Sequence, residues 1–470
     1  RSSLRRYGPT SRAVAARRVV PTLTTLREQH RMRPEIADLV GSGFYPEAGL
    51  VTSPKVLTRA VSPSLRRCLP DGEIYLLDTS YAHPWMARAS GLRSRYNPLH
   101  ALLVDALVRM IEETDGAPDA GIGVIAPYGP QARLIRGLLT DHETTAEAAT
   151  VHRYQGGERD VIIYDTTESP AVGIGLHPWF TGAHGEDAGA RLLNVALSRA
   201  RDRLIIVANV QRLRRSSTTN TAVTRTLAAI FRNATKLNWR HLLAVTSDSL
   251  TRLDGTSGTP LLWEAATQAT KRIVVWSSAT TDHPGSDAFV HALGDAARRG
   301  VEVTLWLPPE GLPRIWPMLA DSGVAVHPLQ RVCENVAVVD DQVFVSTGDL
   351  LATDRRSLTL ARTGPHGSEA LLSLLRRQPI KGAFGDGQPT RLCANCGTPM
   401  TRIERWDKRV WAQCDGCRST SPLPTQQPTP ASMQEPPASG LDRIPRPRTA
   451  PSVCPSCGQI PTATARCSCS

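Results

Sequence analysis

The sequence lacks any apolar run of the roughly 18 residues or more that a transmembrane helix requires, and its first residues do not read as a signal peptide. Aromatic residues are also few, at 5% of the chain. Hydrophobic residues nevertheless make up 41% of the 470 residues, so Leu, Val, Ile and Ala must supply the buried cores. We therefore expect no membrane association and a cytoplasmic protein of about three domains, since a domain typically has roughly 100–200 residues.

Lysine is scarce relative to arginine, and the formal net charge is +12. A positive balance favours polyanionic partners, because each cation that neutralises a phosphate releases a condensed counterion. We therefore expect nucleic acid as a partner, with DNA favoured over RNA. The alternative is a GC-rich genome that encodes arginine where lysine would serve, so charge alone does not decide.

Short apolar runs alternate with amphipathic stretches over residues 1–212. Strands are predicted at 122–126, 161–164 and 204–208, with helices at 128–139 and 192–201. Buried strands that alternate with helices indicate a parallel sheet covered on both faces. The predicted fold class is therefore α/β, with this sheet as the first domain.

A polar stretch, 213–240, reads as a linker with a short helix, and a second α/β domain is predicted over 241–382. Its expected strands are 272–277, 301–307 and a strand–turn–strand at 337–345, and its expected helices are 263–269 and 287–299. Cysteine pairs occupy 388–420 and 451–470. The Pro-, Thr- and Gln-rich residues 421–450 between them are predicted to be a disordered linker.

Four segments of the first domain carry polar and charged residues in a fixed order. They are Leu26–Pro34 (LREQHRMRP), Val124–Gln131 (VIAPYGPQ), Thr150–Asp160 (TVHRYQGGERD) and Asn194–Arg201 (NVALSRAR). Together they resemble the second RecA-like domain of superfamily 1B helicases, the Upf-like branch, whose patterns are roughly LxxQYRMHP, PYxxQ, QGxExD and NVAxTRAR. The resemblance covers about residues 20–210.

The resemblance implies a role for each motif. The catalytic residues would be Arg31 and Arg199, because permanently charged guanidinium groups stabilise the charge that develops on a transferred phosphoryl group. The implied ATP-binding residues are Gln29, Gln155, Gly156, Glu158 and Arg199, and the implied nucleic-acid-binding residues are Pro127, Tyr128, Thr150, His152 and Arg153. Either arginine alone would be explained as well by a surface position or a helix-end ion pair; the ordered set favours the functional role.

Three positions depart from the family pattern. Arg33 stands where the family has His, and Gly157 where it has Arg, and we expect neither position to be essential for the chemistry. His152 stands where the family usually has an acidic residue, which leaves its role open.

No G-x-x-x-x-G-K-[ST] phosphate-binding loop occurs in the sequence, nor an acidic pair at a strand end to hold Mg²⁺. By resemblance, a first RecA-like domain would hold most of the ATP and Mg²⁺. We therefore expect the chain to be inactive alone, and to be either a fragment of a longer product, which we prefer, or the partner of a first RecA-like domain in another polypeptide.

Residues 260–350 resemble one half of the phospholipase D superfamily, whose motif is H-x-K-x4-D with a downstream G-S-x-N. The family's histidine attacks phosphorus and its lysine neutralises the oxyanion. Here the aligned residues are Cys333, Asn335 and Asp340, followed by Ser346–Asp349, so both the nucleophile and the cation are missing. We expect a role in nucleic-acid binding, or in forming a dimer, rather than phosphodiesterase activity.

Eight of the ten cysteines are close together near the end of the sequence. They form Cys393-x2-Cys396-x17-Cys414-x2-Cys417, typical of a zinc ribbon, and the shorter Cys454-x2-Cys457-x9-Cys467-x-Cys469. Paired thiolates that close a tetrahedral site favour structural Zn²⁺, and the alternative, disulfides, is disfavoured in the cytosol.

The sequence therefore predicts the C-terminal part of an ATP-dependent superfamily 1 helicase or translocase. The alternatives are a non-enzymatic nucleic-acid-binding scaffold and a phospholipase-D-type nuclease. An in-frame phosphate-binding loop upstream would favour the motor, and metal-independent cleavage in EDTA would favour the nuclease.

Overall fold

The computed structural model describes most of residues 27–375 and three strands beyond them. The gaps are 62, 90–93, 115–120, 155–156, 172, 182–185, 216–219, 255–257, 279–283, 309–314, 316–317, 320–321, 329–333 and 351–356, and the later strands are 400–404, 410–414 and 420–422. Residues 1–376 form one compact unit and 377–470 a second. Within the described residues no helix is long and apolar enough to cross a membrane.

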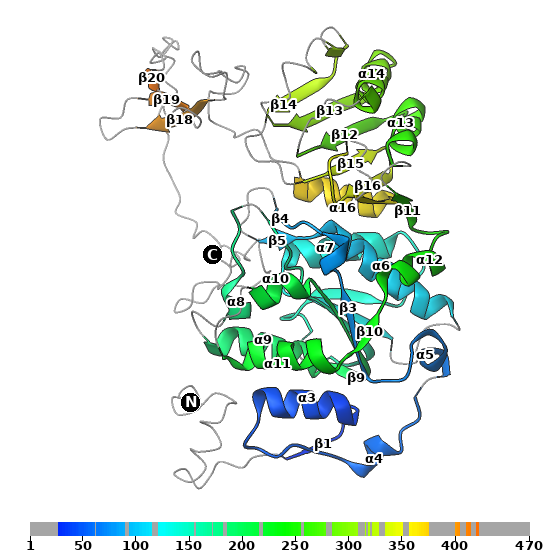
Figure 1. The fold of residues 1–470 in the computed structure, drawn as a ribbon, viewed down its shortest axis with the longest axis vertical. Helices are drawn as coiled ribbons and strands as arrows, with labels where there is room; N and C mark the ends of the chain where they lie inside the picture. Colours follow the sequence, from blue (N-terminus) through cyan, green and yellow to red (C-terminus); the bar gives the residue numbers. More distant parts are fainter. Residues whose placement is uncertain are drawn as a thin grey trace, which may run out of the picture. The chain divides into compact units, whose positions relative to one another are not determined.

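The first sheet has six strands in the order β10-β3-β9-β8-β6-β7, and every neighbouring pair is parallel (Figure 1). Its strands are β3 (Ile74–Asp78), β6 (Ile122–Ala126), β7 (Glu147–Thr150), β8 (Arg159–Asp165), β9 (Ala200–Ala208) and β10 (Thr235–Leu237). The α/β fold class and the parallel first sheet are therefore confirmed.

Helices cover both faces of this sheet because successive strand side chains point to opposite sides. Along β3, for example, Tyr75 and Leu77 enter one core cluster and Leu76 enters the other. The first cluster includes residues of α6 (Pro98–Glu113), α7 (Gly129–Thr140) and α12 (Trp239–Val245). The second includes residues of α3 (Pro34–Phe44), α8 (Pro178–Thr181), α9 (Glu186–Leu197), α10 (Val210–Arg215) and α11 (Ala222–Asn233).

Smaller elements join these layers. They are β1 (Glu28–Gln29), β2 (Val51–Thr52), α4 (Pro54–Leu57), α5 (Pro63–Cys68), η1 (Ser80–Ala82), β4 (Ala87–Arg88) and β5 (Arg95–Tyr96). β1 pairs with β2, and β4 pairs with β5.

Residues 213–240 are not a linker between domains, which corrects the interpretation of their polar sequence. They hold α11, with Leu227 and Ile230 buried in the second core cluster, and β10, which adds an edge strand beside β3. The helix is strongly amphipathic, so its residues Arg225 and Arg232 are exposed while Leu227 and Ile230 are buried. The predicted helix at 192–201 also shifts: α9 ends at Leu197, and Ala200 already belongs to β9.

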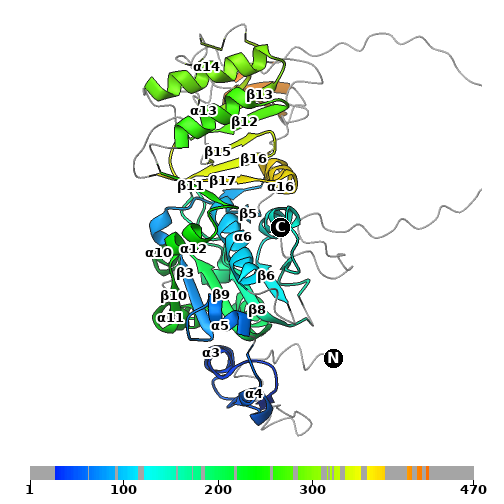
Figure 2. The same cartoon turned by 90° about the vertical axis from the view of Figure 1, so that its right-hand side faces the viewer.

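The second sheet has seven strands in the order β11-β17-β16-β15-β12-β13-β14. Its strands are β11 (Thr251–Asp254), β12 (Arg272–Trp276), β13 (Glu302–Leu307), β14 (Ala325–Pro328), β15 (Val336–Val339), β16 (Gln342–Ser346) and β17 (Leu358–Thr363). β12, β13 and β14 are parallel, and the other pairs are antiparallel. Helices α13 (Gly258–Gln268) and α14 (Pro284–Arg298) lie on one face, where their residues share a core cluster with the sheet (Figure 2).

The opposite face of the second sheet is packed on the first domain. Val338 and Val345 of the second sheet belong to the same core cluster as Tyr75 and Val207 of the first. Helix α16 (Pro365–Leu375) packs on α7 and contributes leucines to that cluster. The two sheets therefore share one core, although they are separate sheets in the order that the sequence predicted.

In the second unit, β18 (Met400–Glu404), β19 (Val410–Cys414) and β20 (Thr420–Pro422) form an antiparallel sheet. Cys414 lies in β19, opposite Met400. The other seven predicted zinc ligands, from Cys393 to Cys469, lie outside the described residues. The zinc sites therefore stay predictions.

Candidate nucleotide site and strand-binding face

The first motif forms a turn that the side chain of Gln29 holds together. Its Oε1 accepts hydrogen bonds from the backbone N–H groups of Arg31 (2.9 Å) and Met32 (2.7 Å). Its Nε2 donates to the carbonyl of Met32 (2.7 Å) and to Oγ1 of Thr52 (2.9 Å). Gln29, predicted to bind ATP, thus fixes the backbone from which Arg31 projects.

Arg31 and Arg199 meet around Glu158, although the three residues are far apart in the chain. Arg31 donates from Nε to Glu158 Oε2 at 2.5 Å and from Nη1 to the carbonyl of Ser198 at 3.1 Å. Arg199 donates to the carbonyls of Val195 and Gly157, each at 3.2 Å. The structure thus brings both predicted catalytic arginines to one place.

Burial, and then the charge of Arg31, lower the pKa of Arg199, while Glu158 opposes the shift. Among the described residues Arg199 forms no ion pair with a carboxylate; the bonds it donates end on carbonyl oxygens. Glu158 is therefore the carboxylate near both Arg31 and Arg199, and it also lies 4.0 Å from Nε of Arg201, which pairs with Asp160 as well. Such a site gains from an added anion, because like charges at close range repel.

An open pocket of about 370 Å³ lies at this place, lined by Gln29, His30, Arg31, Met32, Glu158 and Ser198. It sits by the amino ends of β8 and β9, since Glu158 precedes β8 and Ser198 precedes β9. Gln155 and Gly156, two of the predicted ATP-binding residues, lie outside the described residues. His30 is an additional lining residue that the motif comparison did not single out.

The departure Arg33 has a structural explanation, whereas none is found for Gly157. Arg33 is buried and donates to Asp202 at 2.8 Å; Arg59 donates to the same carboxylate oxygen, also at 2.8 Å. Gly157 offers its carbonyl to Arg199. Arg33 therefore ties the first motif to the start of β9 rather than to the pocket.

The predicted strand-binding residues lie at the other edge of the sheet. Pro127 and Tyr128 follow the carboxyl end of β6, and Thr150 ends the neighbouring β7. Pro127, Thr150 and His152 are half-buried and Arg153 is exposed. Burial lowers the pKa of His152, so its ring is neutral at pH 7. Four of the five predicted residues are thus accessible at one edge.

Tyr128 differs from the expectation, because it is only 3% exposed and cannot face a single strand directly. Its hydroxyl donates to the buried Glu168, which also accepts from Arg95. Trp179 stacks on the Tyr128 ring, with centroids 5.8 Å apart, and His177 meets it edge-on at 5.7 Å. The half-buried Trp179 and His177 therefore form the outer surface over Tyr128.

A buried polar network supports this edge, and sequence reasoning missed it. Gln131, of the second motif, donates to Asp165 at 2.6 Å and accepts from the backbone N–H of Asn97 at 2.7 Å. Asp165 also bonds His100 Nδ1 at 2.8 Å, and the other ring nitrogen of His100 bonds Thr79 at 2.8 Å. The motif glutamine thus joins the ends of β3 and β8 to the start of α6.

In the second domain, the positions aligned to the phospholipase D centre serve the fold. Asn335 Oδ1 accepts from the backbone N–H of Ser278 at 2.9 Å and from its hydroxyl at 3.0 Å. Asp340 accepts from the backbone N–H groups of Lys271 and Arg272 at 2.8 and 2.9 Å. These bonds and others from Thr270 outweigh burial and lower the pKa of Asp340. Cys333 lies outside the described residues.

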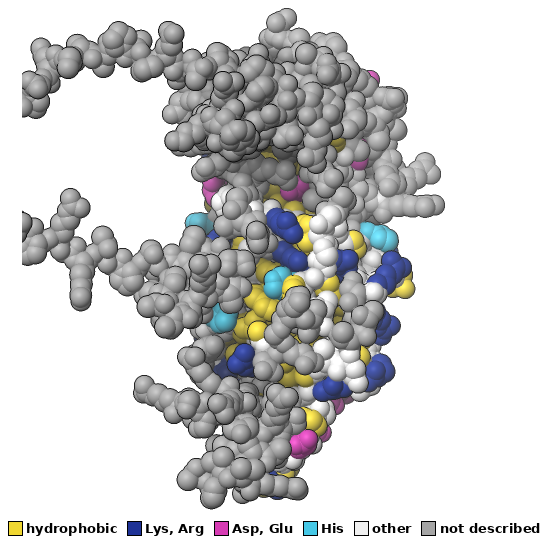
Figure 3. Space-filling model, turned by 90° about the vertical axis from the view of Figure 1, so that its left-hand side faces the viewer, with side chains coloured by type: hydrophobic (Ala, Val, Ile, Leu, Met, Phe, Trp, Pro, Cys, Tyr) yellow, Lys and Arg dark blue, Asp and Glu magenta, His cyan; other side chains and the backbone are white. Residues whose placement is uncertain are grey.

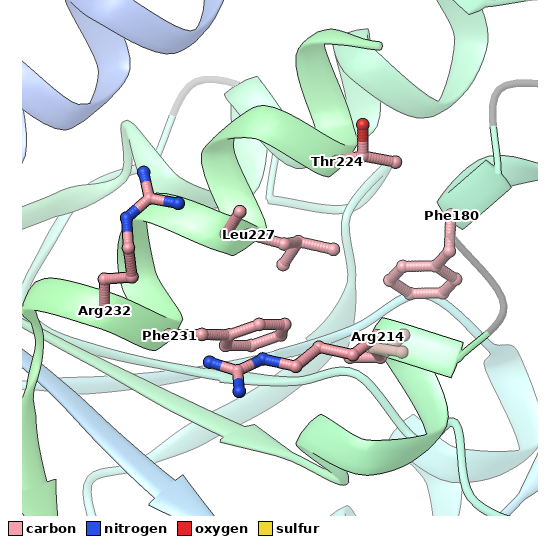
Figure 4. A pocket seen from close by; sticks show the side chains of 8 residues that line it. Phe180, Arg214, Thr224, Leu227, Phe231 and Arg232 are labelled. Carbon is pink, nitrogen blue, oxygen red and sulfur yellow. The ribbon is translucent and has the colours of Figure 1, made fainter. Parts of the chain in front are cut away.

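A second pocket, of about 300 Å³, lies between α8, α10 and α11 (Figure 4). Leu213, Leu227 and the rings of Phe180 and Phe231 supply its apolar lining, and Arg214 extends across Phe231, 5.7 Å from the ring centroid. Its lining includes no carboxylate, histidine or cysteine. It therefore offers no acid–base or nucleophilic chemistry, and the described residues as a whole contain no cluster of metal ligands.

A family model described as an AAA domain matches residues 12–211. The curated proteins that match this part of the chain are named as helicases or helicase/nucleases.

One relative is the DNA replication ATP-dependent helicase/nuclease JHS1 of Arabidopsis thaliana, 28% identical over 210 residues, 41% of this chain and 14% of that protein. Another is the DNA polymerase alpha-associated DNA helicase A of Saccharomyces cerevisiae, 33% identical over 129 residues, 27% of this chain and 17% of that protein. The chain therefore matches less than a fifth of the length of either relative.

Among solved structures, Nuc from Salmonella typhimurium, a phospholipase D family member, is 21% identical and covers 26% of this chain and 87% of that one, with a TM-score of 0.22. A TM-score this low carries no argument about the second domain.

Proposed function

We propose that the first domain is the second RecA-like half of an ATP-dependent helicase or translocase. In this role Arg31 and Arg199 reach the nucleotide held on a phosphate-binding loop of another domain. The observation that carries the proposal is that Arg31 and Glu158 line one open pocket at the amino edge of the sheet, while Arg199 follows the lining residue Ser198 and bonds the carbonyl of Gly157, next to Glu158.

ATP, with its Mg²⁺, supplies the phosphoryl group whose developing charge the two arginines would stabilise. Arg31 is held by Glu158 in this structure, and the side chain of Glu158 is 45% exposed. An anionic phosphate competes with that carboxylate for Arg31, so nucleotide binding would free Glu158 for another partner. The carbonyl oxygens that bond Arg199 carry no net charge, so Glu158 is the carboxylate that partly compensates it.

The two edges of the sheet are connected through the third motif. Residues 151–154 follow the end of β7 at the strand-binding edge, and residues 157–158 precede the start of β8 at the nucleotide pocket. Val151 and Tyr154 anchor this segment in the second core cluster. A displacement of Glu158 on nucleotide binding would therefore also displace Thr150 and Arg153.

We further propose that the nucleic acid is a single strand held at the carboxyl edge by Pro127, Thr150, His152 and Arg153, with Trp179 in place of the buried Tyr128. In Figure 3, Lys and Arg side chains border a hydrophobic patch on one face of the described part. Mixed basic and apolar surface suits phosphate contacts combined with base stacking. DNA is favoured over RNA.

The test measures nucleic-acid-stimulated ATP hydrolysis by this chain combined, in cis or in trans, with a domain that carries a phosphate-binding loop. Arg199→Ala and Arg31→Ala should each lower kcat by roughly 10³- to 10⁵-fold, the range for arginines that act in phosphoryl transfer. Nucleotide affinity should change little. Arg225→Ala is the matched control, because Arg225 is exposed on α11, outside both edges. Unchanged turnover in Arg199→Ala would refute its role.

We also propose that the second unit binds two Zn²⁺ ions, one through Cys393, Cys396, Cys414 and Cys417 and one through the four cysteines from Cys454 to Cys469. Metal analysis of the full chain should then give two zinc ions, and Cys396→Ser should remove one. A wild-type chain without bound zinc would refute this.

A further inference from the structure

Three aromatic rings lie in a row across neighbouring parallel strands of the second sheet. Trp276 of β12 is opposite Trp306 of β13, and Trp306 is opposite His327 of β14. The centroids of the two tryptophans are 5.9 Å apart with planes 5° from parallel, and those of Trp306 and His327 are 4.2 Å apart at 21°. Because directly opposed residues point to the same side, the row lies on one face of the sheet.

That face is not the one covered by α13 and α14. Trp276 belongs to the core shared with the first domain, whereas its neighbours in sequence, such as Val275, belong to the α13–α14 core. The row then leaves the shared core: Trp276 is 1% exposed, while Trp306 and His327 are half-buried and Ala325 of β14 is exposed. β14 is the edge strand of the sheet. The rings thus extend from a buried anchor towards solvent.

The chemistry of the outer rings suits an uncharged, flat ligand. Burial lowers the pKa of His327, so its ring is neutral at pH 7 and stacks without a charge. The ring planes of Trp306 and His327 differ by only 21°, so a further flat ring can stack parallel to both of them. Aromatic side chains of this kind bind the bases of single strands with little sequence preference.

A short chain of contacts links this domain to the strand-binding edge of the first. Trp85, just before β4, donates from Nε1 to the carbonyl of Ser346 at the end of β16, at 2.7 Å. Trp85 also packs edge-on against Tyr96, with centroids 6.3 Å apart. Arg95, the residue before Tyr96, lies over the ring of Tyr128, 5.7 Å from the centroid of that ring. β4 and β5 lie at the junction of the two sheets in Figure 1.

We propose that His327, backed by the ring of Trp306, forms a stacking platform for bases of the single strand that passes the carboxyl edge of the first sheet. The platform rests on the proposed function, because the strand reaches it from the first domain. It gives the second domain a binding role that needs none of the missing phospholipase D residues.

The experiment measures equilibrium binding of fluorescein-labelled dT20 and rU20 to the full chain at several salt concentrations. Trp306→Ala and His327→Ala should each weaken binding roughly tenfold, as expected for the loss of one stacking side chain, whereas Trp306→Phe should retain most of the affinity. The slope of log affinity against log salt should not change, because no cation is removed. Trp263→Ala is the control, since Trp263 is 45% exposed on α13, on the opposite side of the sheet.

The outcomes separate this platform from the function on which it rests. If Arg153→Ala weakens binding and lowers the salt slope while both alanine variants of the platform bind as wild type does, the platform is wrong and strand binding stands. If the wild-type chain binds neither oligonucleotide, both fail. Trp306→Ala could weaken binding simply by destabilising the domain, which would lower its unfolding midpoint. In that case the affinity of His327→Ala, at the sheet edge, is the test. If His327→Ala binds the oligonucleotides as tightly as wild type does, the platform is wrong.

Discussion

Replacing Arg362 by Met tests how the two α/β domains are held together. Arg362, in β17 of the second sheet, is 5% exposed and donates from Nε to Asp105 of α6 at 2.9 Å. Asp105 is fully buried, and its other cationic neighbour is Arg109 at 3.3 Å. Arg362 also donates to the carbonyl of Leu138 in α7 at 3.2 Å. One side chain thus bonds two helices of the first domain.

The expected loss follows from burial. Removing one partner of a buried pair costs roughly 3–5 kcal/mol, because the remaining charge stays out of water. Arg109 still neutralises part of the charge on Asp105, so we expect a loss near the lower end, about 3 kcal/mol. The control is Glu369→Gln, which breaks a pair with Arg272 within the second domain where Glu369 is 53% exposed. An exposed pair of this kind contributes roughly 1 kcal/mol or less.

The assay is urea unfolding of the full chain, followed by fluorescence and circular dichroism. The double variant Asp105→Leu with Arg362→Met should recover part of the lost stability, because it removes the unpaired buried carboxylate but leaves Arg109, whose side chain is 13% exposed, without its partner. If Arg362→Met costs no more than Glu369→Gln, or if the double variant is no better than the single one, the shared core alone holds the domains and our reasoning about this pair is refuted.

Three further predictions concern local features. Gly137→Ala should destabilise by roughly 1–3 kcal/mol, because its Cβ would lie 2.6 Å from Cβ of Ala370 and 2.8 Å from the carbonyl oxygen of His366; urea unfolding with Ala370→Gly added should show partial recovery. Burial, and then the charge of Arg95, lower the pKa of His177 to about 4. The buried neutral ring therefore makes its full contribution to stability above the pKa of about 6.5 that His177 has in the unfolded chain. This contribution is lost as the pH falls through 4. The urea midpoint of wild type should therefore drop more between pH 6.5 and 4 than that of His177→Gln, and equal drops would contradict this. Asp340→Ala should cost roughly 2–3 kcal/mol, since a charged acceptor loses several backbone donors, with Asp340→Asn intermediate; a neutral result by thermal unfolding would show that the turn does not need it.

The strands were the most predictable part of the fold. The runs IGVIA and RIVVW are found as strands with the predicted bounds or nearly so, because continuous apolar residues bounded by polar ones have few other stable environments. Residues 213–240 were misread because composition was weighed over periodicity: the buried Leu227 and Ile230 and the exposed Arg225 fit a helical pattern that the Thr-rich sequence obscured.

The candidate site was predictable in its members but not in its contacts. Ordered motifs identified Arg31, Glu158 and Arg199, which the fold brings together. The same motifs placed Tyr128 on the surface, since the sequence does not show that Trp179, from the distant helix α8, covers it. Pairings between residues far apart in the chain, such as Arg362 with Asp105, depend on the packing of one sheet on another and leave no local pattern.

Helix α7 connects the carboxyl edge of the first sheet to the second domain. Gln131 near its start is bonded to Asp165 at the strand-binding edge, at 2.6 Å. Asp141, just after its end, accepts from the backbone N–H groups of His366 and Gly367, each at 2.8 Å, and so caps the start of α16. Twelve helical residues, about 18 Å at a rise of 1.5 Å per residue, therefore span from the strand-binding edge to the second domain. Because both ends are fixed by buried or charged contacts, we expect that, if the proposed function holds, a displacement of the first domain carries the second sheet with it, and that a base stacked at His327 moves together with a strand held at Thr150.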